Sequence, residues 1–246
     1  MKKVYLPLLI TVMVLFTGMK AFAYDCEVDG IYYYRISATE LEVANKVFSD
    51  QNRTAYTSSV SIPATVTYMG KTFNVVSIGE YAFRDCASLT SISIPSSVKT
   101  IKSYAFFNCS QISNINLPSG LKSLGEGAFE GCTALTSMLI PTGVPEIEDE
   151  TFYGCTSMKT IILPGSINSI GLGAFARCTS LLSIYMFGVT SPSCEPSAFD
   201  KVDRTWCTLY VPKSGKGYQE NEVWKEFFIE EFEGKMEDIP MNTPTK

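Results

Sequence analysis

The residues best suited to chemistry in this chain are its eight cysteines, since the sequence contains no histidine. A thiolate can act as a nucleophile, a metal ligand or one half of a disulfide. Each of these uses requires thiols that meet in space or that lie beside a base. Five of the cysteines recur every 23 residues, at Cys86, Cys109, Cys132, Cys155 and Cys178. What these thiols do therefore depends on the elements that carry them.

The lack of histidine also excludes the common catalytic pairings, because Ser-His-Asp and Cys-His pairs need an imidazole as the base. Carboxylates could still act alone, and the densest acidic run is "EIEDE" at residues 146–150. This run lacks the spaced ligand order of a calcium loop and is interpreted as a solvated corner. The five regular cysteines form no C-x-x-C pairs. We therefore predict a non-enzymatic protein with no catalytic residue, no metal and no cofactor.

The regular cysteines belong to a repeat, and one unit shows how it is built. Apolar residues within 82–89 fall at i, i+1, i+4 and i+7, which predicts a short helical segment. Residues 91–94 alternate serine with isoleucine, which predicts a strand, and Pro95 ends that strand. The units begin at Ile78, Ile101, Leu124, Ile147 and Ile170.

A fixed period of this length is typical of a solenoid, in which each coil buries its apolar face against the next. The cysteines occupy equal positions in successive coils, beside phenylalanine and leucine. We therefore expect their side chains to point into the core, where a free cysteine behaves as a small hydrophobic residue.

The repeat consensus, "IGxxAFxxCxxLxxIxIPxxV", resembles the 23-residue repeat of the BspA-like leucine-rich-repeat proteins of bacterial surfaces. The resemblance covers Ser59 to Pro212. It implies an α/β solenoid: a right-handed leucine-rich repeat with one parallel sheet and short helical segments on the opposite side. It also implies adhesion, because proteins of this family are associated with attachment to host matrix proteins and to other bacteria.

The remaining sequence predicts the ends of the solenoid. Residues 1–23 have two lysines, an apolar core and alanines at 21 and 23, which is the layout of a secretory signal peptide. We predict a β-rich N-terminal cap over 24–58, the solenoid over 59–212, a C-terminal capping helix over 213–232 and an acidic tail over 233–246.

The outer face of the strands offers the candidate binding site. The outward column changes from polar to apolar along the stack, reading Ser93, Asn116, Leu139, Ile162 and Tyr185. We predict partner binding at Leu139, Ile162 and Tyr185, joined by Lys159 and Phe187. If exposed, such a ladder marks a contact site. The alternative is that the loop around Pro192 or the C-terminal tail covers it.

Two further cysteines, Cys194 and Cys207, lie in the irregular sixth coil. They are a possible disulfide, and two free thiols are the equal alternative. Cys26 lies several coils away from both, which is too far for a disulfide.

Composition limits the partners. The formal net charge is −5 and no basic run follows Lys2 and Lys3, so no nucleic acid is expected as a partner. No apolar run is long enough for a membrane span in the mature chain. We predict an exported protein that is surface-displayed, secreted or periplasmic and binds a protein or glycan ligand outside the cytoplasm. The alternative is a structural or accessory component of the cell envelope.

Overall fold

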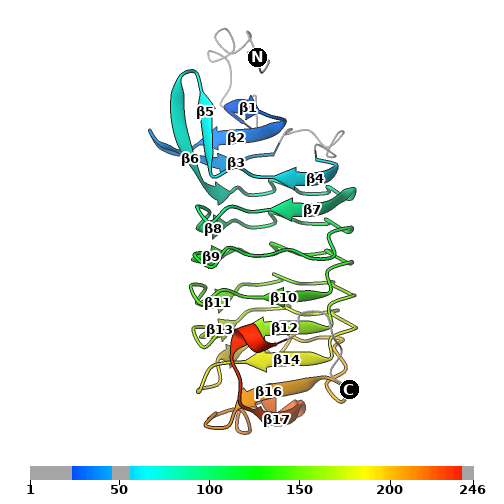
Figure 1. Cartoon of the computed structure of the whole chain (residues 1–246). Helices are drawn as coiled ribbons and strands as arrows, with labels where there is room; N and C mark the ends of the chain where they lie inside the picture. Colours follow the sequence, from blue (N-terminus) through cyan, green and yellow to red (C-terminus); the bar gives the residue numbers. More distant parts are fainter. Residues whose placement is uncertain (1–23, 46–55, 240–246) are drawn as a thin grey trace, which may run out of the picture.

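The computed structural model describes residues 24–45 and 56–239 as a β-solenoid of about seven turns (Figure 1). The predicted signal peptide, 1–23, lies outside the described residues, as does the end of the predicted tail. Successive coils lie on top of one another from the blue N-terminal end to the orange and red C-terminal end. The repeat thus becomes a stack, as its 23-residue period indicated.

One ladder of parallel strands runs along the stack on the side of the predicted strands. β4 (Ser58–Ser61) pairs with β7 (Leu89–Ser93). Further along, β10 (Ser137–Leu139), β12 (Thr160–Leu163), β14 (Ser183–Met186), β16 (Thr208–Pro212) and β17 (Phe228–Phe232) form a five-stranded sheet in that order. All of its pairs are parallel and hold the coils in register. We call this set of strands the first ladder.

A second ladder corrects the prediction of a single parallel sheet. It contains β6 (Lys71–Ile78), β8 (Thr100–Ile101) and β9 (Ser123–Leu124), followed by β11 (Glu146–Ile147), β13 (Ser169–Ile170) and β15 (Ser193–Cys194). Most of these strands are two residues long, which is too short for an alternating pattern to be recognised in the sequence. Coils therefore pair with their neighbours along two sides, with a break between β7 and β10 in the first ladder and between β9 and β11 in the second.

The predicted helical segments are wrong, because residues around Phe83 form turns. The N–H of Cys86 donates to the carbonyl of Phe83 (3.1 Å), whereas the N–H of Phe83 donates to Ala105 in the next coil (2.8 Å). Tyr81 and Asp85 have positive φ angles of 56° and 58°. A left-handed residue in each half of the turn prevents an α-helix from forming. Bonds to the next coil replace the helical ones.

The core consists of side-chain ladders that run through all the coils. Six phenylalanine rings stack in sequence with centroid separations of 5.1–5.6 Å, namely Phe83, Phe106, Phe129, Phe152, Phe175 and Phe199. All six are fully buried. Because each ring contacts only its neighbours above and below, the core is continuous but local, as in other solenoids.

At the N-terminal end, β1 (Cys26–Val28), β2 (Ile31–Arg35) and β3 (Glu40–Val43) are antiparallel neighbours. β3 pairs in parallel with β6, at the start of the second ladder. β5 (Thr65–Tyr68) forms a hairpin with β6 around Gly70, which has a positive φ of 76°. These strands extend the second ladder beyond the first regular coil.

The predicted capping helix over 213–232 is wrong. The segment contains only a short 3-10 helix, η1 (Trp224–Glu226), before it becomes β17 and pairs with β16. As a strand, the segment supplies hydrogen bonds to an edge of β16 that a helix would leave unpaired. Trp224 and Phe227 do cover the last ring of the phenylalanine ladder, at 5.4 and 5.1 Å from Phe199. A second 3-10 helix, η2 (Met236–Asp238), follows β17.

Candidate functional site

Four aromatic residues gather on the outer face of the first ladder, at its C-terminal end. Tyr185 and Tyr210 stack with centroids 4.5 Å apart. Phe232 meets Tyr185 edge to face at 5.7 Å and Phe187 at 5.1 Å. We call these four residues, Tyr185, Phe187, Tyr210 and Phe232, the outer aromatic cluster.

Strand register explains why these residues meet. Tyr185 of β14 pairs with Tyr210 of β16, and Pro212 at the end of β16 pairs with Phe232 of β17. Residues two apart on a strand point to the same face, so all of them face away from the core. Their neighbours Ile184 and Leu209 are buried in the core. Parallel stacking thus converts separate positions of three coils into one aromatic surface.

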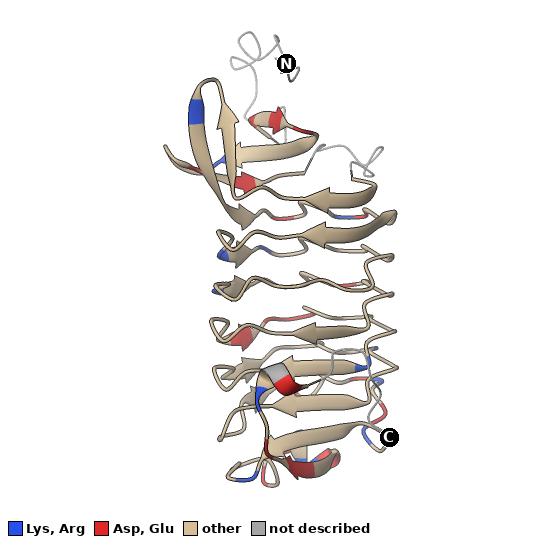
Figure 2. Cartoon of the chain, in the orientation of Figure 1, with Lys and Arg blue, Asp and Glu red and all other residues tan. Residues whose placement is uncertain are grey.

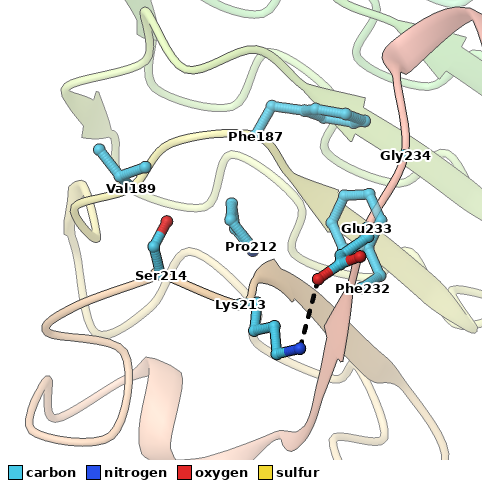
Figure 3. A pocket seen from close by; sticks show the side chains of 8 residues that line it. All are labelled: Phe187, Val189, Pro212, Lys213, Ser214, Phe232, Glu233 and Gly234. Atoms are coloured by element: carbon cyan, nitrogen blue, oxygen red, sulfur yellow. Dashed lines mark ion pairs between the residues drawn. The ribbon is translucent and has the colours of Figure 1, made fainter.

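A pocket of about 640 Å³ lies beside this cluster (Figure 3). Phe187 and Phe232 form one wall, and Val189, Pro212, Ser214 and Gly234 contribute to the rest. Lys213 and Glu233 lie next to each other at its margin, with Nζ and Oε1 3.4 Å apart (Figure 3). Both of these side chains are largely exposed, so their ion pair is weak and exchangeable.

The neighbouring loops hold the pocket in place. The hydroxyl of Tyr218 donates to the carbonyl of Gly188 (2.7 Å), and the indole N–H of Trp224 donates to the carbonyl of Pro192 (3.0 Å). Both donors are buried. The pocket therefore combines aromatic side chains with one cation, Lys213, and one anion, Glu233. The two buried hydrogen bonds fix the backbone of the loops around it. Such a surface suits recognition of an amphipathic ligand, in which apolar groups meet the rings and polar groups meet the charges.

The predicted site residues are only partly brought together. Phe187 is half-buried in the pocket wall, and Leu139 is half-buried on β10. Ile162 and Tyr185 are buried, at 0% and 6% exposure, although neither belongs to the hydrophobic core cluster. Figure 1 shows the segment after β17 passing in front of β12 and β14. At Ile162 and Tyr185 the outward apolar column is therefore covered. Covering of this column was the alternative to its exposure as a binding surface.

Lys159 lies away from the pocket. It is exposed and immediately precedes β12, whereas Phe187 immediately follows β14. The two positions are at opposite ends of adjacent strands, about 16 Å apart along the strand direction. The cation that does line the pocket is Lys213.

Tyr210, Phe232 and Lys213 were not predicted from the sequence. Tyr210 follows Tyr185 by 25 residues rather than 23, because the sixth coil is stretched by two residues. Allowing for that stretch would have placed Tyr210 in the outward column. Phe232 lay in the predicted helix, where no strand register could be assigned to it.

The five regular cysteines are buried, as expected, and each of four has a specific partner. The thiols of Cys109, Cys132, Cys155 and Cys178 donate to phenylalanine carbonyls of the preceding coil at 3.1–3.2 Å. Burial raises the pKa of Cys132 and Cys178 to about 12. Such thiols are protonated at neutral pH and are poor nucleophiles. They serve as compact core residues that also add a second hydrogen bond to a carbonyl that already accepts a backbone N–H.

Cys194 and Cys207, the possible disulfide, are both free thiols in the structure. Cys194 ends β15 in the second ladder, whereas Cys207 precedes β16 in the first ladder and is fully buried. The two ladders occupy different sides of the coil, which keeps the thiols on separate elements. Two free thiols are the alternative that the sequence left open for these cysteines.

Within residues 24–45 and 56–239, no three His, Cys, Asp or Glu side chains are grouped so that they could hold a metal ion. No helix in this part of the chain is long and apolar enough to cross a membrane.

The two ladders, the 23-residue register and the stacked phenylalanines define a leucine-rich-repeat solenoid. The family described as "BspA type Leucine rich repeat region" matches residues 76–203 with six copies. The chain belongs to this BspA-type leucine-rich-repeat family. No curated protein matches the chain.

Solved structures of bacterial leucine-rich repeat proteins are similar to the chain. A Bacteroides ovatus protein is 27% identical with a TM-score of 0.54, and the match covers 78% of this chain and 60% of that protein. A T. pallidum protein is 28% identical with a TM-score of 0.55, covering 65% of this chain and 71% of its own. The chain therefore spans about three-fifths of the length of the first protein.

Proposed function

We propose that this chain is an exported, non-enzymatic binding protein, an adhesin-like module that contacts host matrix proteins or bacterial surface proteins. The observation that carries the proposal is the pocket between Phe187 and Phe232, with Lys213 and Glu233 at its margin. Membership of a repeat family whose fold serves protein interaction supports it. Partly exposed aromatic residues with adjacent charges are typical of interface anchors.

The predicted residues take different parts in this proposal. Phe187 contacts the partner directly, together with Phe232 and Lys213. Leu139 and Lys159 are accessible at the far end of the same face and would meet only a partner that extends across several coils. Ile162 and Tyr185 are buried and support the surface from beneath.

Export can be tested separately from binding. Cleavage after Ala23 would leave Tyr24 as the first residue of the mature protein. Amino-terminal sequencing of the protein recovered outside the cytoplasm is expected to start at Tyr24. Recovery of the uncleaved chain in the cytoplasm would contradict export.

Affinity capture tests the binding site. The parent protein is offered matrix proteins and bacterial surface extract beside a variant carrying Phe187→Ser and Lys213→Glu. A matched control carries Leu172→Ser and Lys122→Glu, which likewise replace one apolar residue by serine and reverse one lysine, at exposed positions of other coils. Capture that persists in the control and is lost in the pocket variant supports the proposal. Equal capture by all three would place the site elsewhere, and capture by none would favour the envelope component.

A further inference from the structure

The last strand of the first ladder has an open edge. β17 pairs with β16 on one side and, among residues 24–45 and 56–239, with no strand on the other. It lies at the end of the stack in Figure 1. Phe228 is 62% exposed, and Glu230 and Glu231 are exposed as well. An exposed edge with unpaired backbone groups is a template for one further strand.

This edge is acidic. From Glu226 to Glu233 the chain carries four glutamates and no lysine or arginine. Glu226 is paired with Arg204, and Glu233 with Lys213. Glu230 and Glu231 have no ion-pair partner in the described part of the chain, and Figure 2 shows the acidic colour on this terminal strand. The open edge therefore carries negative charge that the chain itself does not neutralise.

The position of these charges decides which strand fits. Glu231 pairs with Val211, whose side chain is in the core, so it occupies an inward position. Another apolar coil stacked here would bury this carboxylate without a partner, which is costly. A second copy pairing antiparallel about Glu230 would set that residue against its own counterpart, and like charges directly opposite are destabilising. Both a further repeat and self-pairing are disfavoured.

We propose that β17 accepts a strand from a partner protein whose extended segment carries two adjacent basic residues flanked by apolar ones. The basic residues lie opposite Glu230 and Glu231, and the apolar ones lie beside Phe228 and Ile229. Backbone hydrogen bonds to the open edge supply affinity, and the charge pairs supply selectivity. This inference goes beyond the proposed function, because it uses the edge of the sheet rather than its outer face.

The test uses a fluorescent peptide, acetyl-TVVKKVT-amide, titrated against the full chain by fluorescence anisotropy. Saturable binding is expected, and it should weaken roughly tenfold when both glutamates are reversed in a Glu230→Lys, Glu231→Lys variant. The matched control, Glu146→Lys with Glu148→Lys, makes the same change in net charge on β11 and the turn after it. The control should keep the affinity within roughly twofold. A TVVEEVT peptide should bind the parent roughly tenfold more weakly.

A second peptide separates strand addition from simple charge attraction. N-methylation of alternate residues keeps both lysines but removes backbone donors, so strand addition predicts that binding is lost. Equal binding of the methylated peptide would overturn the proposal, as would no binding of TVVKKVT or unchanged binding by the Glu230→Lys, Glu231→Lys variant. Loss of binding in a Phe187→Ser variant would place the peptide in the pocket and also overturn it. Should the reversed variant fail to fold, Glu230→Gln with Glu231→Gln makes the same comparison.

Discussion

At the scale of single residues, the repeated cysteine has two roles. It fills a core position, and its S–H donates to a phenylalanine carbonyl of the preceding coil. In the stretched sixth coil the corresponding position is Val202, which fills space but has no donor. The recurrence of cysteine therefore reflects packing and hydrogen bonding between coils rather than redox chemistry.

Cys132→Ala should lower the free energy of unfolding by about 1–3 kcal/mol, because it leaves a small cavity and removes the bond to Phe106. Chemical denaturation at neutral pH measures the change. Cys194→Ala is the control, since Cys194 is only partly buried and should change stability less. Equal losses from the two substitutions would contradict a packing role specific to the ladder.

The same thiols predict an alkaline loss of stability. In the unfolded chain a thiol has a pKa of about 8.5, whereas burial raises the pKa of Cys132 and Cys178 to about 12. The folded state keeps protons that the unfolded state releases, so stability is complete below about pH 8.5 and falls as the pH rises toward 12. Denaturation at pH 7 and 10 should differ by about 2 kcal/mol for each of these thiols. Cys132→Ala should show a smaller difference than the parent, and an identical pH dependence would contradict this origin.

At the scale of the turns, backbone conformation limits the sequence at two positions in each of the five regular coils. These positions have positive φ whether the residue is Tyr81, Asn108 or Gly154. Glycine adopts this conformation freely, whereas other residues do so at a cost of about 1 kcal/mol. The bonds to the next coil keep the turn in place where glycine is absent.

Gly154→Ala isolates this backbone cost, because Gly154 has a φ of 71° and a Cβ there would meet nothing within 4 Å. We expect a loss of about 1 kcal/mol in the free energy of unfolding. Thr156→Ala, at an exposed position of the same turn, should change stability by less than about 0.5 kcal/mol. A neutral Gly154→Ala would show that the turn relaxes to accommodate the side chain.

At the C-terminal end, a single tryptophan should hold the last coil. Trp224→Ala uncovers Phe199 and removes the bond to Pro192, so we expect a loss of about 3–5 kcal/mol. Thermal unfolding measures it. Trp206→Ala is the matched control, because Trp206 is 77% exposed and should change stability by less than about 0.5 kcal/mol. Similar effects of the two substitutions would argue against Trp224 as the closing residue.

The elements that repeat could be predicted, and those that end the repeat could not. The strands near Ile92 and the buried cysteines could be predicted because the same pattern recurs in several coils. Its recurrence settles assignments that a single short segment would leave open between helix and strand. Phe227 and Phe228 occur once, and their spacing suits a helix as well as a strand. The open edge of β16 decides between them, and that edge exists only after the coils have stacked.

At the scale of the whole molecule, a solenoid gives one face to each column of the repeat. The inward columns repeat the same apolar residue types and hold the coils together. The outward columns vary from coil to coil. Here the outward column of the first ladder changes from Ser93 to Tyr185, and Tyr210 extends it. Its exposure could not be predicted, because Ile162 and Tyr185 are covered by contacts that the repeat does not encode.

The C-terminal end of the outer face, around Phe187 and Phe232, is the surface that we propose contacts a partner. Hydrogen–deuterium exchange of the protein alone and with its captured partner tests this contact. We expect slowed exchange within 185–189, 210–214 and 228–234, with the first three coils unchanged. Slowed exchange confined to the N-terminal coils, with the pocket segments unchanged, would contradict it.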